Sequence, residues 1–394
     1  MPQLINHGST VKAQRTLLFS EIFPPRTGGS GRWFWEIYRR LPRDRYAFAV
    51  GEHARQDEFD SVHDLHLERL PLAMPEWGLR SFAGLRDYWR NVRQIRGVIR
   101  RHNVTRIHCA RCLPEGVVGL AIKKLTGTPY MCYVHGEDVN TAMNSREHAM
   151  LVRWVLKHTD CCIANSRNTA NLLMQNWNCP VDRVRILHPG VDTTRFTPAA
   201  RSDVVRCKLG WGDRPVVLTV GRLQRRKGHD MLIRALPDIR AKVPGVLFAI
   251  VGNGEEREYL EGLSHQLGVA DHVQFRGETT DEELVQCYQQ CDLFALPNRE
   301  IDRDIEGFGM VLVEAQACGK PVIAGDSGGT AETMQVGKTG LIVDCREPEP
   351  LAKGVVSLLT SPEEREAMGR AGRQWVLQQF DWEQLARQAS TICT

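Results

Sequence analysis

The residues best suited to chemistry include two cations that lie five positions apart, Arg222 and Lys227, in the segment GRLQRRKG. This segment follows an apolar run and leads into a helical pattern, which predicts a loop at the end of a strand. The planar fork of Arg222 and the compact charge of Lys227 would hold a diphosphate from two sides, a task that metal ions perform elsewhere. A solvated basic loop is the alternative when the segment is considered alone.

Two carboxylates, Glu306 and Glu314, lie eight positions apart in the segment EGFGMVLVE. We expect Glu306 in a loop after a strand and Glu314 in the helix that follows. The loop continues with Gly307, Phe308 and Gly309, and its glycines allow backbone N–H groups to point toward a ligand. Carboxylates accept hydrogen bonds from sugar hydroxyls, so the pair is suited to a polyol. A helix-capping role for Glu306 is the alternative.

A glycine-rich stretch, residues 24–31 (PPRTGGSG), follows a predicted strand and precedes a helix that we expect to begin at about Arg32. Glycines permit close approach of a ligand, and N–H groups at a helix start attract anions, so Gly29 and Ser30 are candidates for binding a phosphate or a polar substrate. The stretch matches only part of the dinucleotide fingerprint, because Phe34 stands where the third glycine belongs. A tight structural turn is the alternative.

Three other groups of residues have the composition of functional sites, and each has a structural alternative. His135 follows an apolar run, where a histidine held by the fold is the simpler interpretation. Asp302 and Asp304 form a D-x-D pair of the kind that holds divalent ions, but their polar context predicts a surface loop. Cys109 and Cys112 form a C-x-x-C pair, which is typical of half a zinc site or of a redox pair. No second pair follows at ligand spacing, so we expect two buried thiols and no metal.

The composition limits the classes to which the protein can belong. With 394 residues, of which 42% are hydrophobic and 25% charged, the chain is long enough for two domains of about 150 residues and is neither disordered nor fibrous. No apolar run approaches the ~20 residues that cross a bilayer, and the first residues are too polar for a signal peptide. We therefore expect a cytoplasmic protein whose twelve cysteines remain reduced.

Short apolar runs alternate with helical patterns along both halves of the chain. The predicted strands are residues 15–20, 46–50, 105–109, 130–134 and 161–165, and then 215–221, 246–252, 272–277, 292–297, 321–325 and 340–344. Strands separated by helices form parallel sheets covered on both faces, so we predict an α/β fold with two doubly wound, Rossmann-like domains. The segment 188–203 is the expected linker, and a ligand should bind in a cleft at the carboxyl ends of the strands.

The two halves differ in charge, because residues 1–190 carry a net +10 and the remainder −6, which together give the +4 of the chain. A basic half suggests an anionic partner. Residues 80–106 hold eight arginines and one acid on a predicted amphipathic helix. The apolar residues of its expected buried stripe are Leu85, Trp89, Val92, Ile95 and Ile99. Packing on the sheet is the simpler interpretation of this helix, and docking on anionic lipid is the alternative.

GRLQRRKG, followed by EGFGMVLVEAQACGKPVIAGDSGG, is similar to the donor half of glycosyltransferase family 4, retaining enzymes of the GT-B fold. The spacing of the two glutamates and the cation pair before them are the specific features. The similarity also covers VHGEDV, CCIANSRNTANLL, RVRILHPGVDTTRF and FDWEQLA, and it most resembles phosphatidylinositol mannosyltransferase-type members. It implies an acceptor-binding domain (1–190), a domain that binds the nucleotide-sugar donor (191–375) and a C-terminal helix (376–394) that crosses back to the first domain.

The resemblance implies roles for the residues of the second domain. Arg222 and Lys227 would hold the donor diphosphate, and Glu314 the ribose hydroxyls. Glu306, with the backbone of Gly307, Phe308 and Gly309, would hold the transferred hexose. The loops at Gly252 and Gly277 are the expected place of base recognition.

The resemblance also places Gly29, with Ser30, near the phosphates or the acceptor, and His135 beside the reacting sugar carbon. His135 would supply a hydrogen bond and not a covalent link. No enzyme nucleophile is evident, so the leaving phosphate would help to deprotonate the acceptor hydroxyl on the same face.

The predicted function is retaining transfer of a hexose from a nucleotide-diphosphate sugar to an acceptor hydroxyl on a lipid-linked or anionic precursor. The resemblance favours GDP-mannose over a UDP-hexose as donor. We expect no metal or other cofactor, no nucleic-acid partner, and peripheral contact with an anionic membrane at its inner face. The alternatives are a sugar-nucleotide epimerase or oxidoreductase and a catalytically inactive GT-B scaffold.

Overall fold

The computed structural model describes residues 15–26, 28–63 and 65–392, whose contacts divide the chain into two compact units. The first unit extends to Tyr133 and includes Glu147–Cys162; the second comprises Val134–Arg146 and everything from Ile163 onward. The short segment that carries His135 therefore belongs to the second unit, although its neighbours in sequence belong to the first. Thr27 of the glycine-rich stretch lies outside the described residues.

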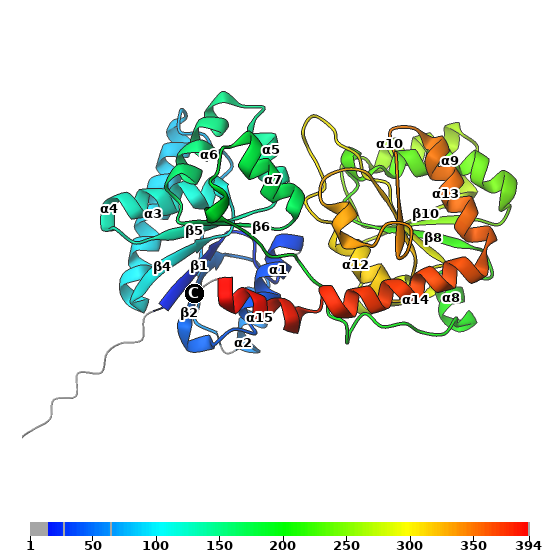
Figure 1. Ribbon diagram of the computed structural model, residues 1–394, viewed down its shortest axis with the longest axis horizontal. Coiled ribbons are helices and arrows are strands. Elements are labelled where there is room, and N and C mark those ends of the chain that lie inside the picture. Colours follow the sequence, from blue (N-terminus) through cyan, green and yellow to red (C-terminus); the bar gives the residue numbers. More distant parts are fainter. Residues whose placement is uncertain (1–14, 27, 64, 393–394) are drawn as a thin grey trace, which may run out of the picture. The chain divides into compact units, whose positions relative to one another are not determined.

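The first sheet has seven strands in the order β3-β2-β1-β4-β5-β6-β7 (Figure 1). These strands are β1 (Arg15–Ser20), β2 (Tyr46–Gly51), β3 (Leu67–Leu70), β4 (Val104–Cys109), β5 (Tyr130–Val134), β6 (Cys161–Ala164) and β7 (Val184–Ile186). β1 pairs in parallel with β2 and β4, and parallel neighbours need a crossover connection. The helices of this part are α1 (Gly29–Tyr38), α2 (Gln56–Ser61), α3 (Phe82–His102), α4 (Val117–Thr126), α5 (Glu137–Ala142), α6 (Arg146–His158) and α7 (Arg167–Asn176).

The second sheet has six strands in the order β10-β9-β8-β11-β12-β13, all paired in parallel. They are β8 (Val216–Val220), β9 (Leu247–Val251), β10 (Val273–Gly277), β11 (Leu293–Leu296), β12 (Val322–Gly325) and β13 (Gly340–Val343). The accompanying helices are α8 (Asp203–Lys208), α9 (His229–Lys242), α10 (Arg257–Gln266), α11 (Asp281–Gln290), α12 (Met310–Ala317), α13 (Pro348–Thr360), α14 (Pro362–Gln379) and α15 (Trp382–Ile392).

Both faces of the second sheet are buried, as Figure 1 shows by the helices on either side of it. Val216 and Leu218 of β8 enter one hydrophobic core, while Val217 enters the other. Successive side chains of a strand point to opposite faces, so an uninterrupted apolar run buries both. The first of these cores includes Leu312 from α12, and the second includes Leu232 from α9. The prediction of doubly wound parallel sheets is confirmed.

All eleven predicted strands are present, each within about one residue of its predicted bounds. Two strands were not predicted, β3 and β7. β3 (LERL) has two charged residues between two leucines, all of them half-buried, and β7 is only three residues long at the edge of its sheet. Neither has the continuous apolar character that reveals a central strand.

The predicted start of the first helix was wrong by about one turn. α1 begins at Gly29 and not near Arg32, and the backbone N–H of Arg32 already donates to Gly28 O at 3.1 Å. Gly29 and Ser30 are therefore the first residues of a helix and not part of a loop. No side chain caps this helix at Gly28, since glycine has none to offer.

The predicted buried stripe of α3 was wrong in its first half. Leu85 and Trp89 are 50% and 64% exposed, whereas Tyr88 and Ile95 are buried. The helix instead buries the face that contains Gly84, Asp87, Tyr88, Asn91, Ile95 and Val98. As a result, α3 presents an apolar surface outward over its first turns.

The described cysteines, eleven in number, are all free, and Cys109 and Cys112 are both buried. Within residues 15–392, apart from the two masked positions, no helix is long and apolar enough to cross a membrane.

Candidate functional site

Three glycines lie where neighbouring strands of the second sheet end. Gly221 follows β8, Gly252 follows β9, and Gly277 ends β10. The backbone N–H of Gly252 donates to Gly277 O at 2.8 Å, and a Cβ on Gly252 would lie only 2.1 Å from Gly221 O. Gly252 has a φ of +130°, which side chains rarely adopt. The sequence-predicted Gly252 and Gly277 are thus brought together at the carboxyl edge of the sheet.

The loop that follows β11 contains Gly307, whose backbone lies close to that of His135. A Cβ on Gly307 would lie 2.1 Å from the backbone oxygen of His135, so only glycine fits there. The same oxygen accepts a hydrogen bond from Asn165 Nδ2 at 2.9 Å. On the other side, Gly329 N donates to Glu306 O at 2.9 Å. The backbone of the segment that starts at Val134 therefore lies directly against the backbone of the EGFG loop.

One carboxylate oxygen of Glu306 lies between two cations. Lys227 Nζ donates to Glu306 Oε2 at 2.5 Å, and Arg226 Nη1 donates to the same oxygen at 2.7 Å. The other nitrogens of Arg226 face two further carboxylates, with Nη2 3.0 Å from Glu137 Oε2 and Nε 3.1 Å from Asp304 Oδ1. We call these five residues the charge cluster.

The charge cluster keeps its central carboxylate ionised. Burial alone would raise the pKa of Glu306, but Lys227 and Arg226 lower it to about 2. Burial likewise opposes the charge of Arg226, and the three carboxylates around it, with Glu306 first, raise its pKa. Arg226 and Glu306, the two most buried members of the cluster, therefore face one another as charged groups at neutral pH.

The second predicted cation, Arg222, has a different environment from Lys227. Its side chain is exposed, and it makes no hydrogen bond or ion pair with the described residues. It lies in the same loop after β8, and its charge is available to a ligand. Glu314 is 5% exposed on α12, and its Oε2 accepts a hydrogen bond from Tyr288 Oη at 2.8 Å.

Phe308 is the next residue of the loop, and its ring packs against His188, which pairs with Glu332. The rings of Phe308 and His188 are 5.4 Å apart, and His188 Nε2 lies 3.1 Å from Glu332 Oε2. Glu332 also accepts the backbone N–H groups of Arg167 and Asn168 at the start of α7, at 2.6 and 2.8 Å. Burial opposes ionisation of Glu332, but His188 and these N–H groups lower its pKa. Gly309, with a φ of +92°, immediately precedes α12.

The two aspartates of the D-x-D pair lie in one loop but have different environments. Asp302 is exposed, but Asp304 is half-buried and contacts the guanidinium of Arg226. Burial raises the pKa of Asp304 even though Arg226 acts against this. Throughout the described ranges, no three His, Cys, Asp or Glu side chains are placed to hold a metal ion.

Gly29 and Ser30 belong to the first unit and are not part of the charge cluster. Sequence reasoning missed Arg226, Glu137, His188 and Glu332. The only signal for Arg226 was its place in the run RRK, where it could not be told from the exposed Arg225. Glu137 follows His135 by two positions in VHGEDV, which was noted only for its histidine.

Two family profiles match the chain. "Glycosyltransferase Family 4" matches residues 27–195, and "Glycosyl transferases group 1" matches residues 203–375. The chain is 35% identical over 387 residues to the GDP-mannose-dependent alpha-(1-6)-phosphatidylinositol monomannoside mannosyltransferase of Mycobacterium tuberculosis (strain ATCC 25618 / H37Rv), covering 94% of this chain and 96% of that protein. The enzyme of the same name from Mycolicibacterium smegmatis is 34% identical, with 93% and 94% covered.

Solved structures agree on the fold. The crystal structure of Anabaena HepE in complex with UDP and glucose superposes with a TM-score of 0.80 and 23% identity, covering 97% of this chain and all of that one. At this level of identity the likeness concerns the fold alone. Together with the two doubly wound sheets, it confirms the predicted GT-B architecture.

Proposed function

The chain belongs to glycosyltransferase family 4, and on this premise we propose that it transfers mannose from GDP-mannose to a hydroxyl of an anionic glycolipid, with retention at the sugar carbon. The names of the mycobacterial relatives supply this donor and this class of acceptor. These relatives are transferases, so the alternative of an epimerase or oxidoreductase is not favoured. The observation that carries the proposal is the contact of Lys227 with Glu306 at the carboxyl edge of the sheet.

The reaction breaks the bond between the sugar and a phosphate, and its transition state places negative charge on the departing diphosphate. Arg222 and Lys227 stabilise that charge, and positive charge already in place costs little reorganisation during the reaction. Glu306 and the backbone of Gly307 hold the hexose, and Glu314 holds the ribose. These roles require Lys227 to leave Glu306 when the diphosphate arrives.

The acceptor hydroxyl attacks from the face that the phosphate leaves. A phosphate oxygen takes the proton of the hydroxyl, so no enzyme nucleophile takes part. His135 contributes a hydrogen bond beside the reacting carbon. The cation pair supplies the charge that a divalent ion supplies in other transferases, so we propose turnover without a metal.

The first prediction concerns the donor. GDP-mannose at about 100 times its Kd should stabilise the protein by about 2.7 kcal/mol, whereas UDP-glucose, UDP-N-acetylglucosamine and ADP-glucose should have much smaller effects. Thermal unfolding with each nucleotide sugar measures this difference. Turnover with GDP-mannose and a phosphatidylinositol mannoside should continue in excess EDTA. Equal shifts for all four sugars would refute the donor, and loss of turnover on chelation would refute metal independence.

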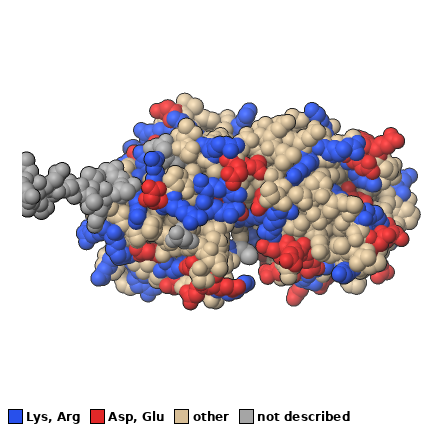
Figure 2. Space-filling model, turned by 90° about the horizontal axis from the view of Figure 1, so that it is seen from below, with Lys and Arg blue, Asp and Glu red and all other residues tan. Residues whose placement is uncertain are grey.

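We also propose that α3 attaches the protein to an anionic membrane. Phe82, Leu85 and Trp89 are 84%, 50% and 64% exposed, and with the exposed Arg93 they lie on one face of the helix at spacings of three and four. We call these four residues the α3 patch. Large apolar side chains beside cations are typical of helices that lie in a membrane interface. Figure 2 shows Lys and Arg side chains over much of the N-terminal part of the molecule.

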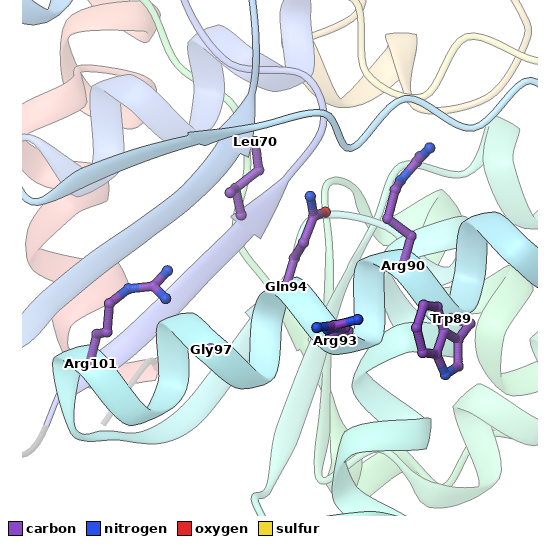
Figure 3. Close-up of a pocket in the computed structure, with 7 residues that line it drawn as sticks. All are labelled: Leu70, Trp89, Arg90, Arg93, Gln94, Gly97 and Arg101. Carbon is purple, nitrogen blue, oxygen red and sulfur yellow. The ribbon is translucent and has the colours of Figure 1, made fainter.

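A pocket next to the α3 patch is rich in arginine. It has a volume of about 390 Å³ and is lined by Leu70 of β3 and by α3 residues Trp89, Arg90, Arg93, Gln94, Gly97 and Arg101 (Figure 3). The guanidinium of Arg93 lies 5.5 Å from the ring centre of Trp89. Arg90 Nε is buried without a partner in the described structure. Such a pocket is suited to the phosphate of an anionic lipid.

The second prediction tests this attachment. The protein should sediment with phosphatidylglycerol vesicles at low salt, less so at high salt, and not with phosphatidylcholine vesicles. Trp89→Ala should lower the bound fraction several-fold, since one buried tryptophan contributes a large apolar area. Trp154→Ala, which removes another half-exposed tryptophan on α6, is the matched control and should bind like wild type. Equal binding of both variants would exclude the α3 patch.

A further inference from the structure

Arg226 is the most firmly held residue of the charge cluster. Its side chain is 5% exposed, and its three nitrogens each face a different carboxylate, Glu137 from one segment and Asp304 and Glu306 from another. Its backbone oxygen accepts the N–H of Arg299 at 2.8 Å. Arg299 is itself fixed by two hydrogen bonds of 2.9 Å to Asp230 on α9. The guanidinium therefore has little freedom to turn toward a ligand.

Lys227 is held differently, although it contacts the same oxygen. Its ammonium group faces only Glu306 among the carboxylates of the described residues, and its side chain is 12% exposed. A lysine side chain is flexible and pairs as a point charge, so it can exchange one anion for another. Glu306 Oε2 thus has one fixed cation, Arg226, and one exchangeable cation, Lys227.

We propose that Arg226 is a positioning residue, which holds Glu306 in place and ionised while Lys227 exchanges Glu306 for the diphosphate of the donor. This inference rests on the proposed function, since it requires that a diphosphate binds at Lys227. It does not depend on which base or sugar the donor carries. Without Arg226, release of Lys227 would leave Glu306 buried with no counterion, which is strongly unfavourable unless the carboxylate takes up a proton.

The groups that control the titration of Glu306 come from three segments. Arg226 and Lys227 follow β8, Asp304 precedes Glu306 in its own loop, and Glu137 begins α5. The two cations lower the pKa of Glu306. The two other carboxylates, Glu137 and Asp304, also pair with Arg226, and the negative charges of Asp304 and Glu306 repel one another directly. Removal of Arg226 therefore acts in one direction, toward a protonated Glu306.

The test compares Arg226→Met with Arg225→Met. Arg225 is the exposed neighbour in the same short helix and has no side-chain partner in the described structure, so its variant is the matched control. We expect kcat to fall about 100-fold in Arg226→Met, as for a catalytic group displaced by about 1 Å, and to change less than about twofold in Arg225→Met. Arg226→Lys should recover part of the loss because it restores a cation.

The pH profile separates positioning from a structural role. In Arg226→Met, kcat should fall as pH decreases from about 7 to about 5, because Glu306 loses both cations in the donor complex and its pKa rises. The profile of kcat/KM should move less, since Lys227 still neutralises Glu306 in the free enzyme. Wild type and Arg225→Met should keep a flat profile. A loss of kcat with an unchanged profile would overturn the proposal.

Proton uptake on donor binding tests the role of Arg226 without turnover. Calorimetry of GDP-mannose binding at pH 6 in buffers of different ionisation enthalpy should show about one more proton taken up by Arg226→Met than by wild type. If wild type binds another nucleotide sugar instead, the proposed donor is wrong, and the proton count is made with that sugar. Equal proton counts would overturn the role of Arg226. If Arg226→Met does not fold, Arg226→Lys takes its place. The kcat of this variant should decrease at low pH, but less than expected for Arg226→Met. A pH profile like that of wild type would refute the inference.

Discussion

Replacement of Arg222 by alanine should lower kcat/KM by about 10³-fold and leave the thermal unfolding temperature unchanged. Removal of one preorganised donor from a developing oxyanion costs about 10²- to 10³-fold, and a cation on a transferring phosphate costs more. Arg222 is exposed, so its loss removes no hydrogen bond or ion pair with the described residues. The two effects together are diagnostic, since a structural arginine would lower both quantities.

Steady-state kinetics with GDP-mannose and thermal unfolding, each with and without GDP, measure these effects. Arg222→Ala should lose most of the stabilisation by GDP, and Arg225→Ala should keep it. A variant that retains activity within about tenfold of wild type would contradict the assignment of Arg222 to the diphosphate.

Replacement of Gly307 by alanine should abolish most activity and destabilise the protein by about 2 kcal/mol or more. The added methyl group would lie 2.1 Å from His135 O and 2.7 Å from Asn165 Nδ2. The first of these atoms belongs to the backbone and cannot turn aside as a side chain can. Either the EGFG loop or the segment from Val134 must shift, and both hold residues assigned to the sugar.

Urea unfolding and turnover measured on the same preparation report the two effects. Gly262→Ala is the matched control, because no atom lies within 4 Å of the added carbon in the exposed middle of α10. This control should be neutral or stabilised by about 0.5–1 kcal/mol, with full activity. Normal stability and activity in Gly307→Ala would show that the two segments are not held in contact in solution.

The central strands could be predicted because each is a continuous apolar run that buries both faces. β3 could not be predicted, since its two charged residues interrupt the apolar run by which a central strand is identified. The stripe of α3 was predicted wrongly for a physical reason: the helix has two apolar faces, one through Leu85 and Trp89 and one through Tyr88 and Ile95. Periodicity identifies an apolar face but cannot say which of two such faces meets the sheet.

Individual residues of the site could be predicted where their side-chain type alone indicates the chemistry. Lys227 and Glu306 were both named, but their direct contact was not, since a spacing in sequence does not fix a distance across two loops. Arg226 was missed because sequence alone gives adjacent arginines equal weight. Only the fold reveals that one of them is buried among three carboxylates and the other lies in water.

The contact between Lys227 and Glu306 also bears on how the catalytic cycle ends. If Lys227 holds the diphosphate as proposed, Glu306 competes for its ammonium group after transfer. Competition from Glu306 would favour dissociation of the nucleoside diphosphate, because Lys227 regains a partner as the product leaves. Under the proposed function, we therefore expect the nucleoside diphosphate to dissociate faster than it would from a lysine without a competing carboxylate.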